Sequence, residues 1–311
     1  MLEIFVSRLI KPLLCLSFAV PLGLLSSCTT SRPEAPVLQP LTGSALAATT
    51  ARLASLLPAD VVLLGEQHDA KEHQHIEQQV IAILAARNQL AAVAIEMADS
   101  GTSTATLKPS ATELQAQSAL KWSQEAWPWE AYGPAVMTAV RAGVPVLGAN
   151  LPRPKMSGSM TDRQLDVQLL GPALKAQQQL IRIGHCNLLP ESQITPMTRI
   201  QIAKDITMAH TLSQAAVPGK IVVLLAGNGH VDRLLGVPQH LPAALKVKAV
   251  RLHAGNSGDT SDSGDTNEIS EKASFDVAWD TPALPETDYC AQLRDQFGVQ
   301  PQVQPAPDAL K

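Results

Sequence analysis

Acidic and imidazole side chains follow four apolar runs of the sequence, at the point where each run ends. Glu66 and His68 follow the first run, Glu96 the second, Arg153 the third and His230 the fourth. Two carboxylates and two imidazoles could hold a divalent metal ion, or they could act as general base and acid in a hydrolytic reaction. Each residue alone also has a structural explanation, since a strand-end Glu often caps a helix and a lone His is commonly a hydrogen-bonded loop residue.

The apolar runs have the length and composition of buried parallel strands, and helical patterns separate them, near residues 133–142, 162–183 and 198–216. The runs cover residues 61–64, 92–95, 144–149 and 221–226. Strands that alternate with helices predict an α/β fold with a mostly parallel central sheet flanked by helices. In such sheets, sites form beyond the carboxyl ends of the strands, so we expect the four polar groups to meet there.

A late strand is predicted at residues 274–280, and its alternating pattern would suit an edge strand that could be antiparallel. We also expect Asp69 to cap the helix that follows the first strand, and His73 and His75 to lie on a solvated face of that helix. The chain has no Walker loop, no Gly-x-Ser-x-Gly elbow and no His-Glu-x-x-His motif, so nucleotide-dependent and serine hydrolase chemistry are unsupported.

Aromatic residues make up only 3% of the chain, yet four of them fall within eleven residues: Trp122, Trp127, Trp129 and Tyr132. They could line a ligand pocket, or the tryptophan rings could fill the space between the helices and the sheet. Tyr132 has a further capacity, because a phenolate is a good ligand for ferric haem iron.

The N-terminal residues have the pattern of a secretory signal. Arg8 and Lys11 precede an apolar run over residues 12–25 that is too short to span a bilayer, and Ser26 and Ser27 precede Cys28. Residues 25–28 resemble a bacterial lipobox, which implies that Cys28 carries lipid after cleavage. The alternative is an ordinary secreted protein in which Cys28 is incidental.

We therefore divide the chain into a signal peptide (1–27), a flexible tether (28–44), an α/β domain (45–255), a disordered loop (256–274), a C-terminal strand and extension (275–299) and a disordered tail (300–311). The net charge of −4 argues against a nucleic-acid partner. In an oxidising compartment, Cys186 and Cys290 could form a disulfide, although sequence alone does not show that they are close enough.

Several of these segments together resemble the ChaN family of iron-regulated haem-binding lipoproteins, within the wider Tiki/TraB and erythromycin-esterase-like superfamily. The residues that carry the resemblance are 64–68, 95–97, 129 with 132–136, 148–153, 201–205, 226–230 and 235–238. They occur in the family's order and span about residues 45–253, so the α/β domain is ChaN-like.

The resemblance implies haem bound near a homodimer interface, with a tyrosine on the iron. Tyr132 is the candidate for this ligand and Tyr289 its only competitor, while His68, Arg153 and His230 could hold the propionates. Thr29 rather than Asp follows Cys28, which resembles lipoproteins sorted to the outer membrane. We therefore expect an outer-membrane lipoprotein of a Gram-negative bacterium, palmitoylated at Cys28, that could pass haem to an outer-membrane haem or iron receptor.

A second hypothesis comes from superfamily relatives that keep similar residues as a catalytic site. On that hypothesis the chain is a hydrolase that uses Glu66, His68, Glu96 and His230, with or without a divalent metal. A third option is a structural envelope protein in which these residues are vestigial.

Overall fold

A computed structural model describes residues 43–255 and 274–296, which belong to one compact unit. Six parallel strands form one sheet in the order β3-β2-β4-β1-β5-β6. Their bounds are β1 Val61–Glu66, β2 Leu90–Asp99, β3 Val146–Asn150, β4 Ile221–Gly227, β5 Val247–Ala254 and β6 Val277–Thr281. The predicted α/β fold with a mostly parallel sheet is therefore confirmed.

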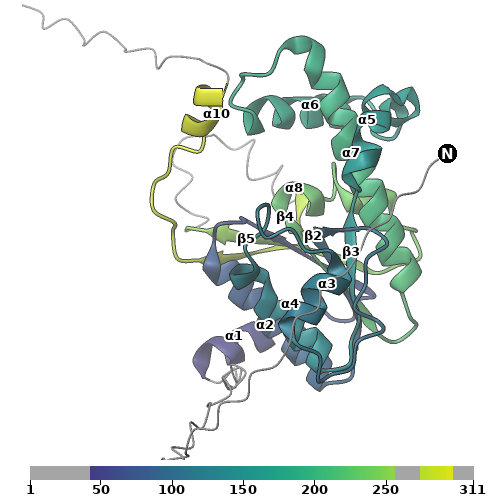
Figure 1. Cartoon of the computed structure of the whole chain (residues 1–311), viewed down its shortest axis with the longest axis vertical. Coiled ribbons are helices and arrows are strands. Elements are labelled where there is room, and N and C mark those ends of the chain that lie inside the picture. Colours follow the sequence, from purple (N-terminus) through teal and green to yellow (C-terminus); the bar gives the residue numbers. More distant parts are fainter. Residues whose placement is uncertain (1–42, 256–273, 297–311) are drawn as a thin grey trace, which may run out of the picture. The chain divides into compact units, whose positions relative to one another are not determined.

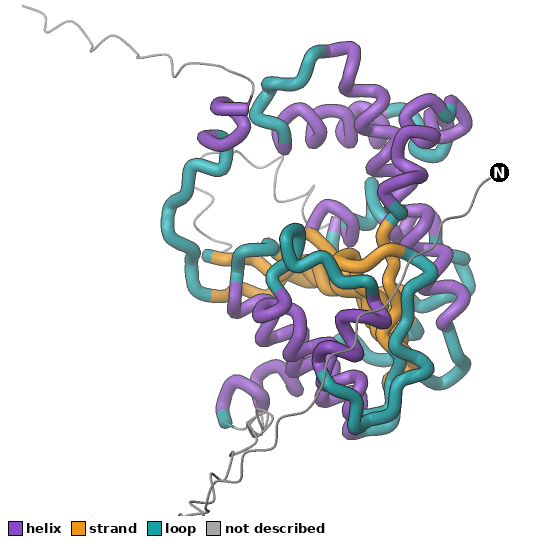
Figure 2. The backbone as a smooth tube through the Cα atoms, in the orientation of Figure 1, coloured by secondary structure: helices purple, strands orange, loops and turns teal. Residues whose placement is uncertain are grey.

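Helices surround the sheet (Figures 1 and 2). Their bounds are α1 Ser44–Ala54, α2 Lys71–Ala86, α3 Glu113–Leu120, α4 Trp129–Arg141, α5 Arg153–Thr161, α6 Pro172–Gly184, α7 Glu191–Ala215, α8 Asn228–Val231 and α10 Ala291–Gln296, with short 3-10 helices η1 Arg163–Val167 and η2 Val237–His240. Among the described residues, no helix is both long enough and apolar enough to cross a membrane.

The alternation of side chains along each strand divides the core into two layers. On β1, Val62 and Leu64 pack against the helices α1, α2 and α4, whereas Val61 and Leu63 face the layer covered by α7. These strand side chains are fully buried. The continuous apolar run that predicted β1 therefore reflects burial on both faces of the sheet, as expected of a central parallel strand.

Three features differ from the sequence-based expectations. β5 was not predicted, because Lys248, Arg251 and His253 interrupt its apolar pattern. β6 pairs with β5 in parallel rather than antiparallel. The helix expected over residues 162–183 is broken, since η1 ends before Gly171, which has a φ of +51°, and α6 begins after it.

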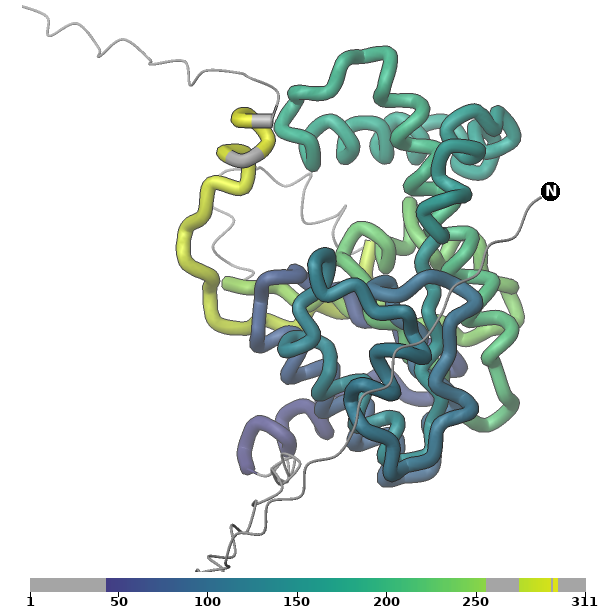
Figure 3. Tube along the Cα trace, in the orientation of Figure 1, coloured from purple at the N-terminus to yellow at the C-terminus, as the bar shows by residue number. Residues whose placement is uncertain are grey.

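The C-terminal segment runs from β6 toward the turn between α6 and α7 (Figure 3). There a disulfide joins Cys290 to Cys186, with a Cα–Cα distance of 5.8 Å. The predicted signal peptide with Cys28, residues 256–273 of the predicted loop 256–274 and the predicted tail 300–311 lie outside the described residues, whereas Ser274 is described and buried.

Candidate functional site

The two predicted site carboxylates lie on opposite faces of the sheet. Glu66 continues the side-chain alternation of Val62 and Leu64, so it points toward α2 and α4. Glu96 continues the alternation of Ala92 and Ala94, so it points toward α7. The two acids stand at the carboxyl ends of β1 and β2, on either side of the end of β4. A single pocket on one face of the sheet could not hold both.

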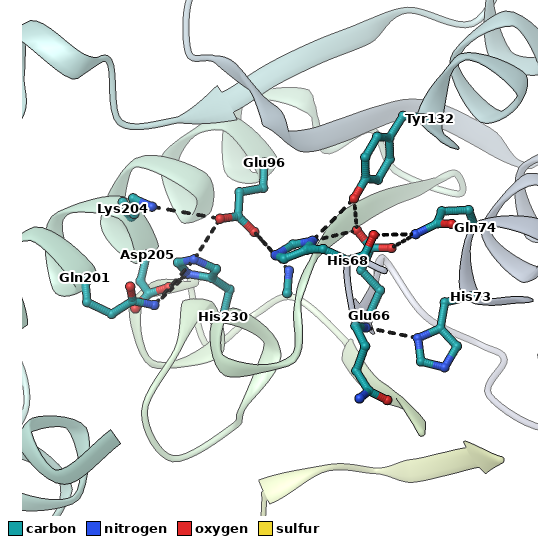
Figure 4. A network of polar contacts seen from close by, with 12 residues as sticks. Glu66, His68, His73, Gln74, Glu96, Tyr132, Gln201, Lys204, Asp205 and His230 are labelled. Atoms are coloured by element: carbon teal, nitrogen blue, oxygen red, sulfur yellow. Dashed lines mark hydrogen bonds and ion pairs between the residues drawn. The ribbon is translucent and has the colours of Figure 1, made fainter. Parts of the chain in front are cut away.

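His68 connects the two faces by reaching over the carboxyl end of β4 (Figure 4). Its Nδ1 lies 2.9 Å from Oε1 of Glu66, and its Nε2 lies 3.9 Å from Oε2 of Glu96. Gly227 ends β4 directly beneath the imidazole, and a Cβ atom there would lie 2.9 Å from Nε2. The missing side chain at residue 227 therefore provides the space in which His68 crosses between the two acids.

On the α2 and α4 side, Glu66 accepts two further hydrogen bonds. The hydroxyl of Tyr132 donates to its Oε1 at 2.8 Å, and Nε2 of Gln74 donates to its Oε2 at 3.0 Å. Trp127 contacts the ring of His68 edge-on, with centroids 4.9 Å apart. Glu66 is thus a buried carboxylate whose oxygens are satisfied by three neighbouring side chains.

On the α7 side, Glu96 and Asp205 hold His230 between them. Nε2 of His230 lies 3.2 Å from Oε1 of Glu96, and its Nδ1 lies 2.5 Å from Oδ1 of Asp205. Nζ of Lys204 lies 3.9 Å from Oε1 of Glu96, and the backbone N–H of Gly227 donates to Oε2 at 2.9 Å. Both ring nitrogens of His230 are therefore engaged by carboxylates.

These contacts determine the charge of His230. Burial opposes protonation, but the charges of Glu96 and Asp205 outweigh it and raise the pKa of His230 to about 10. Burial likewise disfavours the charged form of Glu96, yet His230 brings the pKa of that carboxyl well below its usual range. Burial raises the pKa of Asp205 to about 6 in spite of His230. At neutral pH the arrangement is an imidazolium between two carboxylates.

His68 is the most accessible of the four predicted residues, with 40% of its side chain exposed. Burial lowers its pKa, but the hydrogen bond that Glu66 accepts and the charge of Glu96 outweigh burial, so the net shift is upward. The ring borders a cleft of about 390 Å³, whose other lining residues include Asp69, Lys71, Gln74, His75 and Pro134. An N–H of the His68 imidazole can therefore meet an anionic group that enters this cleft.

The structure brings Glu66, His68, Glu96 and His230 into one connected network, but the network does not suit a metal ion. Metal binding requires neutral imidazole nitrogens with a free lone pair, whereas the nitrogens of His230 face carboxylates in a protonated ring. Within the described ranges, no group of three or more His, Cys, Asp or Glu side chains could hold a metal ion.

Tyr132, the predicted iron ligand, lies in the core beside Glu66. Its side chain is 2% exposed, and its hydroxyl is committed to Glu66. Burial and the charge of Glu66 raise the pKa of Tyr132 far above that of a free phenol, so the phenolate that iron requires is strongly disfavoured. Trp122 and Trp129 pack edge-on at 5.0 Å beside it. The aromatic group is therefore part of the core, as the packing explanation proposed.

Arg153, the remaining predicted contact, is exposed at the first residue of α5 and makes no hydrogen bond or ion pair with the network in the described part of the chain. His73 is wholly buried rather than solvated, because Nδ1 accepts from the backbone N–H of Gln67 at 3.0 Å and Nε2 lies 3.0 Å from Oγ1 of Thr281. Asp69 does not cap α2, whose N-cap is Ala70, and instead accepts a hydrogen bond from Tyr289.

Sequence reasoning did not assign roles to Gln201, Lys204 and Asp205. They lie one turn apart on α7 and all contact His230 or Glu96. Their spacing of three and four residues places them on one helix face, which was the available signal. Nothing in the sequence showed that this face of α7 covers the end of β2.

A second, apolar cleft of about 700 Å³ lies between α6 and η2. Its lining includes Leu170, Ala176, Leu180, Leu234 and Leu235. Leu170 is 74% exposed and Leu180 43% exposed, which is unusual for leucine side chains gathered in one place. This surface is suited to an apolar ligand rather than to water.

Comparison with known proteins relates the chain to haem-binding proteins. Residues 52–241 match the family described as haem-binding uptake, Tiki superfamily, ChaN. A solved structure described as cofacial heme binding to ChaN of Campylobacter jejuni is 27% identical, with a TM-score of 0.57, over 67% of this chain and 86% of that chain. The type III effector HopBA1 is 16% identical over 72% of this chain and 88% of that chain, and its TM-score of 0.40 is too low to support a functional comparison.

No match is found among curated proteins. The family match alone covers more than half of the 311 residues. This chain is therefore a member of the ChaN haem-binding uptake family of the Tiki superfamily.

Proposed function

We propose that the chain is a lipid-anchored haem-binding protein of iron acquisition. The observation that carries the proposal is the apolar cleft of about 700 Å³ beside α6, in a chain that belongs to a haem-binding family. A porphyrin is a broad apolar plate, and ligand sites of this kind are lined mainly by apolar side chains with a few polar groups. The exposed leucines of this cleft meet that requirement.

For the iron ligand we propose Tyr289 in place of Tyr132. The chain has two tyrosines, and Tyr289 is 59% exposed, so an iron centre can approach its oxygen. Its hydroxyl donates a hydrogen bond of 2.7 Å to Oδ2 of Asp69. This hydrogen bond raises the pKa of Tyr289, and the Asp69 carboxylate would be positioned to receive the phenolic proton if the oxygen bound haem iron. The following residue is Cys290, whose disulfide to Cys186 ties the tyrosine to the end of α6.

For the propionates we retain His68 and Arg153 and set His230 aside; His68 lines the cleft of about 390 Å³, which shares no lining residue with the apolar cleft. His68 is partly exposed, so its imidazole can donate an N–H to a carboxylate. Arg153 is exposed on α5. His230 has no comparable capacity, because its two nitrogens already face Asp205 and Glu96.

A dimer is part of this proposal, because a surface that packs against one face of a porphyrin leaves the opposite face uncovered. A second copy of the chain could cover it, and the cofacial heme binding described for the Campylobacter jejuni protein is compatible with such a pairing. Light scattering of the mature protein with and without haemin tests this point. We expect the dimer fraction to rise when haemin is added, and an unchanged monomer would contradict it.

A charge placed in the cleft tests the haem site. Leu180→Asp should weaken haemin binding to the mature protein by at least about tenfold, because a carboxylate would face the porphyrin in an apolar environment. Leu114→Asp is the matched control, since Leu114 is 76% exposed on α3, outside the cleft lining. Equal haemin affinities for the two variants, measured by Soret absorbance, would exclude this surface as the site.

The anchor is the second element of the proposal. We propose that Cys28 is acylated and that the protein resides in the outer membrane, where it could exchange haem with a receptor. Cells grown with labelled palmitate should incorporate the label into the wild-type chain and not into Cys28→Ser. Label on the variant, or a wild-type chain found wholly in the soluble fraction, would contradict the anchor.

We favour haem binding over the hydrolase alternative. The carboxylates on either side of His230 raise its pKa to about 10, so in a hydrolase the general base would be Glu66 or His68 rather than His230. The network of Glu66, His68, Glu96 and His230 is explained as a set of charge pairs that joins the ends of β1, β2 and β4 to α4 and α7.

A further inference from the structure

The segment that carries Tyr289 has little structure of its own. Residues 282–290 follow β6 without forming a helix or strand, and most of their side chains are exposed. Because a segment with few buried contacts gains little from packing, its position depends on the specific contacts that tie it to the rest of the chain. Two such long-range contacts involve neighbouring residues, Tyr289 and Cys290.

The disulfide attaches the segment to a well-defined helical corner. Cys186 lies in the turn between α6 and α7, where Cys186 and Asn187 both adopt a φ of +56°. The backbone N–H of Cys186 donates to the carbonyl of Ile183 at 2.8 Å, and Nδ1 of His185 lies 2.8 Å from the carbonyl oxygen of Ile181. The partner of Cys290 is therefore held by the hydrogen bonds that end α6.

The tyrosine hydroxyl is fixed at the opposite end. It donates to Asp69, which follows His68 in the loop after β1. The side chain of Tyr289 thus spans from the segment that is cross-linked to the α6–α7 turn to the carboxyl edge of the sheet. The cross-link closes a separation of 104 residues, so without it the position of Tyr289 would rest on an exposed segment and one surface hydrogen bond.

We propose that the Cys186–Cys290 disulfide is a positioning element for the iron-ligating tyrosine. This inference rests on the proposed function. Its physical basis is preorganisation: a tethered side chain loses less conformational freedom when it binds, so more of the interaction energy appears as affinity. The disulfide does not touch the ligand, and its effect on haem acts through Tyr289.

The test compares the wild-type mature chain with Cys186→Ser/Cys290→Ser. Both cysteines are replaced, because a single substitution would leave a thiol that could itself bind iron. Haemin titration gives the affinity, and the tyrosinate-to-iron charge-transfer band reports the ligand. We expect the double variant to bind haemin at least about tenfold more weakly and to lose most of this band.

Tyr289→Phe is made in both backgrounds. If the disulfide acts through the tyrosine, this substitution should have a large effect in the wild type and little further effect in the double serine variant. Independent, additive effects would overturn the inference, as would a charge-transfer band that survives removal of the disulfide.

A second variant covers the case in which the double serine protein does not fold. Two glycines inserted between Tyr289 and Cys290 keep the cross-link but slacken its hold on the tyrosine, and this variant should also lose the band. An unchanged band would contradict the inference. If the wild type itself binds no haemin, the proposed haem binding fails. If it binds haemin with a spectrum that Tyr289→Phe leaves unchanged, haem binding stands, and both the assignment of Tyr289 as iron ligand and the present inference fail.

Discussion

The buried imidazolium of His230 makes a quantitative prediction about stability. His230→Gln removes the cation that lies between Asp205 and Glu96 and leaves two buried carboxylates near each other. Loss of one partner from a buried ion pair costs about 3–5 kcal/mol. We therefore expect urea unfolding at pH 7 to show that the variant is less stable than the wild type by about that amount.

The stabilisation by His230 should decrease as the pH rises. The folded protein holds the pKa of His230 at about 10, above its reference value of 6.5, so the stabilisation is fully present below pH 6.5 and is lost as the pH rises toward 10. Each pH unit in this window removes about 1.4 kcal/mol. The advantage of the wild type over His230→Gln should therefore shrink by about 2.5 kcal/mol between pH 7 and pH 9.

His240→Gln is the control for this experiment. Burial lowers the pKa of His240, and its Nε2 has no hydrogen-bond partner in the described structure, so its linkage has the opposite sign. The folded protein keeps His240 neutral while the unfolded chain protonates it, so its effect appears only as the pH falls below 6.5. A difference between wild type and His230→Gln that stays constant from pH 7 to pH 9 would refute the assignment of an imidazolium.

Three further substitutions probe the surroundings of the network. Glu77→Gln should leave the free energy of unfolding in urea unchanged at pH 4 and raise it by at least about 1 kcal/mol at pH 8. The reason is that Glu77 is fully buried without hydrogen-bond partners in the described structure, and burial raises its pKa well above 4.5. Equal free energies of unfolding at pH 8 would contradict this. Gly227→Ala should displace His68 and bring its pKa down toward 6.5 in an NMR titration, whereas an unshifted titration would show that the ring tolerates the methyl group. Gly133→Ala should lower stability by about 1–3 kcal/mol in thermal unfolding, since the added Cβ would lie 2.5 Å from the ring of Trp129; an unchanged melting temperature would count against this packing.

The sequence predicted the strands that are apolar throughout and the edge at which their polar residues meet. β1 and β4 are buried on both faces, so a continuous run of apolar residues predicts each of them as a strand. β5 was missed for the complementary reason: it lies nearer the edge of the sheet, and its charged side chains interrupt the apolar pattern.

The candidate site could be predicted only in part. Their positions at strand ends identified Glu66 and Glu96. The sequence does not show which face of the sheet each side chain points to, so their placement on opposite faces could not be predicted. Asp205 and Lys204 come from the middle of a long helix, and only tertiary packing brings that part of α7 over β2. The burial of Tyr132 likewise depends on how α4 packs, so its contact with Glu66 could not be predicted from the sequence.

The most direct test of the proposed function is a haemin titration of the mature protein followed by Soret absorbance, with Tyr289→Phe and Tyr132→Phe measured alongside the wild type. The account predicts saturable binding by the wild type, weaker binding with an altered spectrum for Tyr289→Phe, and a spectrum like that of the wild type for Tyr132→Phe. A wild-type protein without a saturable Soret shift would contradict haem binding, and a spectral change in Tyr132→Phe alone would contradict the assignment of Tyr289 as the iron ligand.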